Sequence, residues 1–245
     1  MSRDKYRALE HSAAAYENTV ISGWEGLYRE KQRRLIEAFA PYMRGNNALE
    51  LGVADGEMSV RLAAFFPRLT IIDGSKLHLE QAKARLAAAG HGQVTAVHAL
   101  FEEYAPTERF DAIFMAHVLE HLDDPVAVLR RAASWLTESG RIFCAVPNAN
   151  SLHRHIGVKL GQLERIDSLH AQDILVGHQR VYVPDSLRRD VAAAGLRRIK
   201  FGGLMVKPLS NRQMNDWPQE ILEALFAISE EFPEICSEIY VVAEQ

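Results

Sequence analysis

Cysteines, long apolar runs and excess positive charge are scarce in this sequence. The two cysteines, Cys144 and Cys236, each lie in or beside an apolar run, which predicts buried thiols rather than a disulfide framework. The N-terminus has no apolar signal-peptide core, and no stretch is long enough to span a membrane. We therefore expect a cytoplasmic protein with no membrane partner.

The sequence also has no excess of basic over acidic residues. The chain has 28 Lys and Arg against 32 Asp and Glu, a net charge of −4, and both signs are spread along its length. This distribution argues against a surface devoted to the nucleic-acid backbone, so no nucleic-acid partner is expected. At 245 residues, without internal repeats, the chain is predicted to form a single domain over residues 1–245.

Strand-like and helix-like segments alternate from residue 47 onward. The predicted strands are 47–51, 69–73, 94–99, 110–115 and 141–146, and the predicted helices between them are 57–66, 76–89 and 124–136. Further on, we predict helices at 184–194 and 219–231, a strand at about 197–202 and a closing strand at 235–243. Such alternation needs crossover connections, which indicates an α/β fold with a mainly parallel sheet and helices on both faces.

Three segments fall outside this alternation. Residues 1–44 are helix-compatible, and they are either a solvated helical face or an N-terminal lid that contributes Tyr6, Tyr16, Trp24 or Tyr28. Residues 148–183 and 203–218 are irregular and too long for plain connections, so we predict that they are insertions on the substrate side.

The turn after the first predicted strand differs from a dinucleotide-binding turn. It reads Gly52-Val53-Ala54-Asp55-Gly56, so the middle glycine of G-x-G-x-x-G is missing and an acid stands where a pyrophosphate would lie. Glu50 adds a second negative group, while Asp73 ends the next strand at the position of a ribose-binding acid. The turn favours a cationic, adenosine-containing cofactor without a pyrophosphate.

These motifs, together with FDAIFMAHVLEHLDDP from residue 110 and SGRIFCAVPN from residue 139, resemble the class I S-adenosylmethionine-dependent methyltransferases. The resemblance implies a Rossmann-like fold with seven strands in the order 3-2-1-4-5-7-6, the last one antiparallel, and S-adenosylhomocysteine as product. It implies cofactor-binding roles for Glu50, Gly52, Gly56, Asp73, Gly74, Ser75, Leu100, Phe101, Glu102, Met115 and His117. Leu100 and Phe101 depart from the usual polar pattern, so we expect an apolar or stacking contact with adenine.

Two histidines are the candidate catalytic residues. The resemblance places His117 where the methyl group emerges, either as a base that takes the acceptor's proton or as part of the pocket wall. His178 is the second candidate, in a polar segment of the first insertion. His117, Glu120 and His121 formally match a zinc-protease signature, but the segment leaves a strand and no distant ligand is evident. Some quinone-pathway relatives are thought to hold a divalent metal here with Glu-x-x-Glu-His, and this chain has His117 in place of the first Glu. We assign no metal ligand, and a metal at this segment stays open.

The predicted function is methyl transfer to an oxygen or nitrogen of a small molecule in a biosynthetic pathway. Basic residues in the insertions, such as Lys207, favour an acceptor that bears a carboxylate, phosphate or polarised carbonyl. The alternatives are a cofactor-binding partner without catalysis and a tRNA or protein methyltransferase, which the charge disfavours. A homodimer through the amphipathic helix near residues 217–232 stays open.

Overall fold

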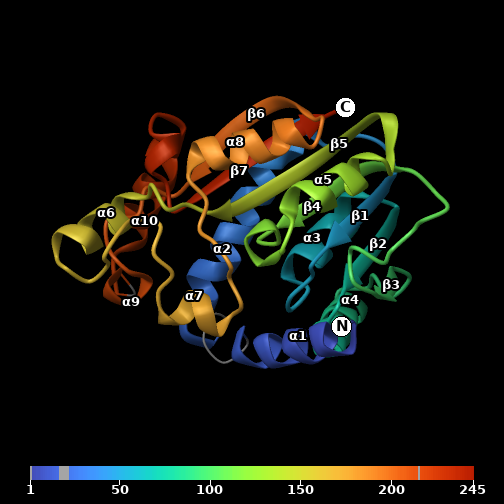
Figure 1. Ribbon diagram of the computed structural model, residues 1–245, viewed down its shortest axis with the longest axis horizontal. Coiled ribbons are helices and arrows are strands. Elements are labelled where there is room, and N and C mark those ends of the chain that lie inside the picture. The colour runs from blue at the N-terminus through green and yellow to red at the C-terminus, as the bar shows by residue number, and fades with distance from the viewer. Residues whose placement is uncertain (1, 17–21, 215) are drawn as a thin grey trace.

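The computed structural model describes residues 2–16, 22–214 and 216–245, without the side chains of residues 2, 22–25 and 212 (Figure 1). The side chains of Trp24, a candidate lid residue, and of Arg212, a basic residue of the second insertion, are therefore not described. At its centre lies a seven-stranded sheet. The strands are β1 (Asn47–Leu51), β2 (Arg68–Asp73), β3 (Thr95–His98), β4 (Phe110–Ala116), β5 (Leu136–Pro147), β6 (Arg197–Leu204) and β7 (Glu238–Glu244).

The strand order is β3-β2-β1-β4-β5-β7-β6, which confirms the predicted topology. Strands β1 to β5 pair in parallel, and β7 runs antiparallel to both β5 and β6. The order reverses between β1 and β4, where the two halves of the sheet diverge. A crevice at the carboxyl ends of these strands is where an open α/β sheet binds its ligand.

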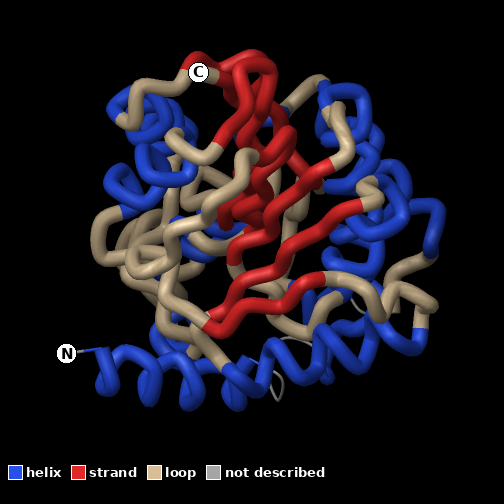
Figure 2. The backbone as a smooth tube through the Cα atoms, turned by 90° about the vertical axis from the view of Figure 1, so that its right-hand side faces the viewer, coloured by secondary structure: helices blue, strands red, loops and turns tan. Residues whose placement is uncertain are grey.

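Helices cover both faces of the sheet (Figure 2). One face packs against α2 (Ser22–Phe39), α3 (Glu57–Phe65), α4 (Lys76–Ala88) and α10 (Gln219–Ala227), and the other against α5 (Pro125–Ala133) and α8 (Pro184–Ala193). The alternation along β4 separates the two cores, since Ile113 and Met115 face α5 while Phe114 faces α2. Both cysteines are free and buried, as predicted.

Two element boundaries differ from the prediction. The helix expected at 124–136 ends at Ala133, because Leu136 already pairs with Phe110 across a bulge and so begins β5. The closing strand begins at Glu238 rather than at 235, because Pro233 starts a 3-10 turn, Pro233–Ile235. Asp124 caps α5 through the backbone N–H of Ala127 at 2.9 Å, the role its position before Pro125 predicts.

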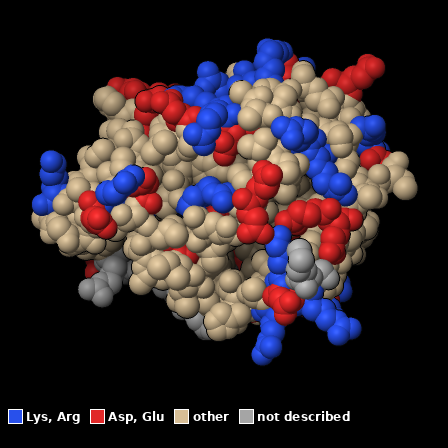
Figure 3. All heavy atoms as spheres, in the orientation of Figure 1, with Lys and Arg blue, Asp and Glu red and all other residues tan. Residues whose placement is uncertain are grey.

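The segments outside the sheet lie at its carboxyl edge. Helix α1 (Ser2–Tyr16) runs across the ends of the strands (Figures 1 and 2). The first insertion contains α6 (Leu152–Lys159) and α7 (Ala171–Leu175), and the second contains α9 (Asn211–Met214). On the face shown in Figure 3, acidic and basic side chains are interspersed. None of the helices described here combines the length and the apolar character that a bilayer span requires.

Candidate functional site

A cavity of about 350 Å³ lies at the carboxyl ends of β1, β2 and β4. Helix α1 covers it on one side, and residues 176–179 of the first insertion close another side. Nine residues predicted from the sequence line it together: Glu50, Gly52, Asp73, Gly74, Ser75, Leu100, Phe101, Glu102 and His117. The structure thus brings together nine residues for which the sequence predicts cofactor contacts, and it places α1, which belongs to the predicted N-terminal lid, over them.

The loop between β1 and α3 needs its glycines for two separate reasons. Gly52 and Gly56 both have left-handed backbones, with φ of +78° and +80°. A Cβ on Gly52 would lie 2.7 Å from Val118 Cγ2, so glycine lets the chain pass close to the segment after β4. A Cβ on Gly56 would lie 2.5 Å from Ala82 Cα, and this glycine therefore permits α3 to approach α4 and does not line the cavity.

Glu50 is a carboxyl group on the cavity wall that forms no ion pair with a basic side chain among the described residues. Its side chain is only 2% exposed, and Ser59 Oγ donates to its Oε2 at 2.5 Å. Burial, together with the charges of Asp73 and Asp55, raises the pKa of Glu50 to about 8. A cationic group placed in the cavity beside Glu50 would reverse this effect, so the site fits a cation.

Asp73 organises two loops at once. Its Oδ2 accepts the N–H of Val53 at 2.9 Å, and its Oδ1 accepts the N–H of Ser75 at 2.7 Å. Each oxygen retains a lone pair, so the fixed carboxylate can still accept a hydrogen bond from a ligand hydroxyl. Gly74 follows directly, and a Cβ there would lie 2.4 Å from Leu9 Cδ1 of α1.

Asp55 is not placed as the sequence argument assumed. Its carboxylate accepts Arg85 Nη2 of α4 at 2.6 Å and the Tyr28 hydroxyl of α2 at 3.0 Å, and it does not line the cavity. Glu50 and Asp73 are thus the acids next to this turn that line the cavity, and Asp55 adds no carboxylate to its wall. The sequence could not show this, because Arg85 lies 30 positions away and meets Asp55 only where α3 and α4 pack together.

Helix α1 is held over the site by polar contacts. Glu10 accepts the backbone N–H of Lys76 at 2.6 Å and the Ser75 hydroxyl at 2.9 Å, so it caps the N-terminus of α4 from outside. Burial opposes ionisation, but the bonds from Lys76 and Ser75 hold the pKa of Glu10 below its usual range. Lys5 pairs with Glu102 and with Asp123, each at 2.9 Å. The sequence did not single out Glu10, because its partners are more than 60 residues away.

The remaining predicted contacts divide into two groups. Leu100 and Phe101, for which the sequence predicts contact with adenine, place apolar surface on the cavity wall, and the Tyr6 hydroxyl accepts the N–H of Leu100 at 3.2 Å. Met115 is fully buried in the core that faces α5 and does not reach the cavity. Strand alternation turns its neighbour Ala116 to the cavity instead.

His117 lies at the end of β4 between two carboxylates. Its backbone is left-handed, with φ of +56°, which aims the ring across the strand ends. Nδ1 lies 3.5 Å from Glu120 Oε1, and Nε2 lies 3.3 Å from Glu238 Oε2. Burial disfavours the charged ring, yet the two carboxylates outweigh burial and raise the pKa of His117 to about 10. The raised pKa favours the imidazolium at neutral pH, and an imidazolium has no free lone pair for the acceptor's proton, so this environment argues against the predicted role of base.

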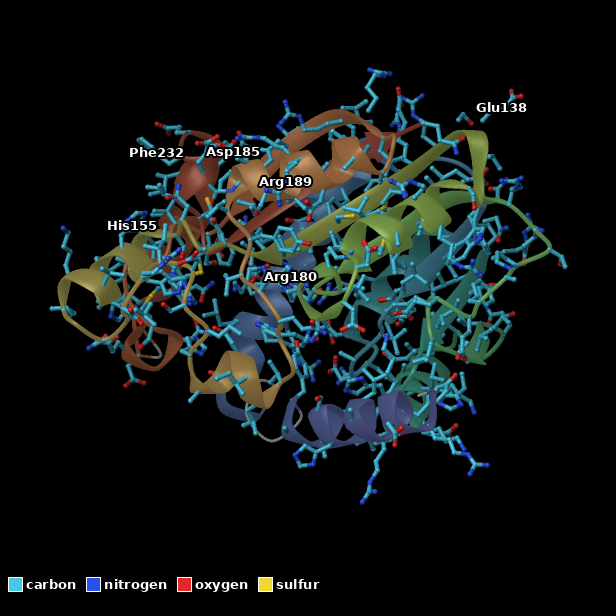
Figure 4. The ribbon with its side chains drawn as sticks, in the orientation of Figure 1. Glu138, His155, Arg180, Asp185, Arg189 and Phe232 are labelled. Atoms are coloured by element: carbon cyan, nitrogen blue, oxygen red, sulfur yellow. The ribbon has the colours of Figure 1, made fainter. Side chains whose placement is uncertain are left out.

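A second, polar cavity of about 200 Å³ adjoins the first one. The two share wall residues that include Tyr28, His117 and His121. His178 lines the second cavity, and its Nδ1 lies 3.1 Å from Asp173 Oδ1. Arg180, from the same segment, donates to the carbonyl of Leu122 at 2.6 Å and so fixes this segment against the turn after β4 (Figure 4).

Glu120, His121 and His178 form a cluster whose ligand atoms all lie within 4.8 Å of one another. Both carboxylate oxygens of Glu120 are buried, and neither has a hydrogen-bond partner among the residues that the structure describes. Burial opposes its ionisation, but His117 and His121 hold the pKa of Glu120 below its usual range. Because the imidazolium of His117 already balances this carboxylate, the charge of the cluster does not demand a metal ion.

A family model described as a methyltransferase domain matches residues 24–200. The ubiquinone biosynthesis O-methyltransferase of Idiomarina loihiensis is 27% identical over 179 residues, which cover 71% of each chain. The corresponding protein of Aeromonas salmonicida is 29% identical over 177 residues, covering 69% of this chain and 70% of the other.

Solved structures share the fold. The N-methyltransferase NodS of Bradyrhizobium japonicum, in complex with S-adenosylhomocysteine, superposes with a TM-score of 0.61 at 16% identity, covering 97% of this chain and 96% of the other. The CcbJ methyltransferase of Streptomyces caelestis gives a TM-score of 0.67 at 17% identity, covering 96% and 98%. Sequence identities of 16% and 17% accompany a shared fold, and they are too low to indicate a shared substrate.

Proposed function

Because the chain belongs to the class I S-adenosylmethionine-dependent methyltransferases, we propose that it transfers a methyl group to an oxygen of a small molecule in a biosynthetic pathway. The methyl donor is S-adenosylmethionine, whose sulfonium supplies a reactive methyl group. The observation that carries the oxygen assignment is the Asp173–His178 pair, because a hydroxyl acceptor has to lose its proton and this pair can take it. A relative named as an O-methyltransferase supports the same choice.

We assign cofactor-binding roles to the residues of the larger cavity. Glu50 would pair with the ammonium group, since a buried carboxyl without a cation fits that charge. Asp73 would accept the ribose hydroxyls on its remaining lone pairs, flanked by Gly74 and Ser75. Leu100 and Phe101 would contact the adenine, while Gly52 lets the cofactor pass close to the backbone.

We assign the proton-accepting role to His178. Its Nδ1 faces Asp173, which fixes the ring and leaves Nε2 to receive the acceptor's proton. His117, as an imidazolium between Glu120 and Glu238, instead holds the wall of the acceptor cavity in place. Methyl transfer is an in-line displacement, so positioning the acceptor close to the methyl group contributes much of the rate.

The test compares His178→Gln and Asp173→Asn with the parent enzyme, in a screen of hydroxyl-bearing small molecules that detects S-adenosylhomocysteine. We expect each substitution to lower kcat by about 10² to 10⁴, the range for loss of a general base, with cofactor affinity unchanged. His155→Gln is the matched control, because His155 is exposed and its ring bonds to Asn150, away from the cavity walls. Full activity in His178→Gln would exclude the base assignment.

We also propose that the reaction needs no metal. Glu120, His121 and His178 offer three ligand atoms, but the Glu120 charge is already met by His117. Activity should therefore survive exhaustive chelation. Loss of activity that Mn²⁺ or Zn²⁺ restores would assign an ion to this cluster.

A nitrogen acceptor is the second candidate. An amine protonated in water also loses a proton before it attacks, so the same histidine could serve it. One structural relative is named as an N-methyltransferase. Testing amines beside the hydroxyl compounds in the same screen distinguishes a nitrogen acceptor from an oxygen acceptor. A tRNA or protein acceptor fits less well, because charges of both signs are interspersed on the surface seen in Figure 3.

A further inference from the structure

A third cavity, of about 480 Å³, lies on the far side of the polar cavity from the cofactor. It is enclosed by α6, α9 and the chain around Lys207. It shares His170, Gln172 and Asn211 with the polar cavity, which in turn shares His117 with the cofactor cavity. The three spaces therefore follow one another from the methyl donor outward into the two insertions.

Positively charged and ionisable basic groups surround this third cavity, which we call the basic cavity. Its wall contains Lys207, Arg154, His153 and His170, and none of the described wall residues is Asp or Glu. The polar cavity next to it differs, because Glu120, Asp173 and Glu238 are part of its wall. An anion would thus meet attraction in the basic cavity and repulsion nearer the methyl donor.

Lys207 is the cation of this wall that lacks a counter-charge. Its side chain is buried, with 8% exposed, and its Nζ donates to Asn211 Oδ1 at 2.9 Å. No carboxylate among the described residues forms an ion pair with it. An ammonium group has three N–H donors, so two of them are available to a ligand.

The other cations near Lys207 are already matched. Arg154 donates through Nε to the carbonyl of Ile166 at 2.6 Å, and its Nη1 lies 3.6 Å from Asp173. Lys31 forms an ion pair with Glu238, which is also in contact with His117. Glu238 is thus shared between two cations before Lys207 is considered.

A purely structural role does not explain why the side chain of Lys207 is buried. One hydrogen bond to an amide does not compensate for the desolvation of an ammonium group. Burial and the charge of Lys31 accordingly lower the pKa of Lys207 to about 7. A methionine would fill the same space at no electrostatic cost, so an amine at this position is best explained by a ligand that needs it.

We propose that the basic cavity is the subsite for an anionic group of the methyl acceptor, a carboxylate or phosphate that pairs with Lys207 Nζ. This inference rests on the proposed function, since it places the reacting hydroxyl beside His178 and the anionic end two cavities away from the donor. It defines the acceptor class as an elongated molecule with a hydroxyl at one end and an anion at the other. Asn211, which holds Lys207, acts as a positioning residue.

The test measures binding to the full chain loaded with S-adenosylhomocysteine, by calorimetry. The probes are 4-hydroxybenzoate, its neutral counterpart 4-hydroxybenzamide, and inorganic phosphate. We expect the parent protein to bind the carboxylate about ten- to a hundredfold more tightly than the amide, the range for one hydrogen bond between charged groups. Phosphate should compete with 4-hydroxybenzoate.

The variants are Lys207→Met, which removes the charge, and Lys207→Arg, which keeps it. We expect the carboxylate preference to vanish in the first and to persist in the second. Lys159→Met is the matched control, because Lys159 lies on α6 but is exposed and not part of the cavity wall.

The outcomes separate the two proposals. Parent protein that binds S-adenosylhomocysteine but shows no carboxylate preference overturns the subsite and leaves the methyltransferase assignment intact. A preference that persists in Lys207→Met also overturns it. Phosphate binding that depends on Lys207 but does not compete with 4-hydroxybenzoate would mark a site for a free anion, and the acceptor subsite would again be overturned. Unchanged affinity of Lys207→Met for S-adenosylhomocysteine shows that this variant is folded.

Discussion

Glu50 shows how a single buried carboxyl can be adapted to a ligand that supplies the missing charge. Its burial and the neighbouring Asp73 raise the pKa to about 8, so it is largely protonated at neutral pH before the cofactor binds. Pairing with an ammonium group requires the ionised form. Binding should therefore release a proton whenever the pH is below the pKa of the free protein.

The affinity for S-adenosylhomocysteine should consequently depend on pH in a defined direction. Between pH 6 and 8 we expect it to rise, approaching tenfold per pH unit, because fewer protons have to be removed from Glu50 as the pH increases. In Glu50→Gln the affinity should be lower and nearly independent of pH over this range. Calorimetry at several pH values measures both, and Glu80→Gln, an exposed acid on α4, is the control.

An affinity of the parent protein that does not change between pH 6 and 8 would contradict this account of Glu50. The sequence predicts a cofactor-binding role for Glu50, and its position before the glycine turn places it at the end of β1, on the cavity wall. Asp55 could not be placed in the same way, since its orientation depends on Arg85 and Tyr28 from two other helices. Local spacing thus determines position along a strand, whereas long-range ion pairs determine where a loop side chain points.

At the scale of elements, the helical conformation of α1 could be predicted from the sequence, but its position over the cavity could not. Its periodic pattern indicates a helix, but the contacts that place it over the cavity are made by Glu10, Lys5 and Tyr6 with residues more than 60 positions away. Polar residues on an exposed helix face are common, so their pattern alone could not separate a lid from a solvated face.

Glu10→Gln should weaken the docking of α1. The substitution removes the negative charge at the N-terminus of α4 and one acceptor of the Lys76 and Ser75 bonds, a loss of about 1–3 kcal/mol for a hydrogen bond to a charged group. Amide hydrogen exchange in residues 2–16 should then speed up, and the affinity for S-adenosylhomocysteine should fall several-fold. Glu37→Gln, an exposed acid of α2 that pairs with Arg33, is the control.

Unchanged exchange in residues 2–16 would show that apolar contacts such as Leu9 on Gly74 hold the helix instead.

The contacts made by the two insertions were also difficult to predict from the sequence. The length of the insertions predicts a functional role, but it does not predict that His178 pairs with Asp173, five residues earlier, or that Lys207 bonds to Asn211, four residues later. These contacts have no counterpart in local periodicity.

At the scale of the whole molecule, the strand order was predictable because hydrophobic period, glycine turns and crossover rules agree from β1 to β5. The role of residues 1–44, which precede β1, was harder to predict. Residues 1–44 were predicted as a lid, but the two helices behave differently. Helix α1 lines the cavity and is tied to it through Glu10 and Lys5, whereas Leu35, Ile36 and Phe39 of α2 are buried in the core of the sheet.

Phe39 provides a test of whether α2 belongs to the core or to the lid. Its ring is fully buried and packs against Phe114, Phe143 and Tyr240, with centroids 6.2, 5.2 and 5.6 Å away, so it joins α2 to three central strands. Phe39→Ala should lower the free energy of unfolding by about 3–5 kcal/mol, as expected for a large cavity in a packed core. Phe39→Leu keeps most of the volume and should cost less.

Urea unfolding followed by fluorescence and by far-UV circular dichroism measures the effect. If α2 belongs to the same cooperative unit as the sheet, both signals shift together in Phe39→Ala, because the cavity weakens every strand that contacts the ring. If α2 were a lid that opens independently, the sheet would unfold at the parent urea concentration. A transition unchanged in Phe39→Ala would therefore assign residues 22–39 to the lid, while a joint shift leaves α1 as the element free to open over the cofactor.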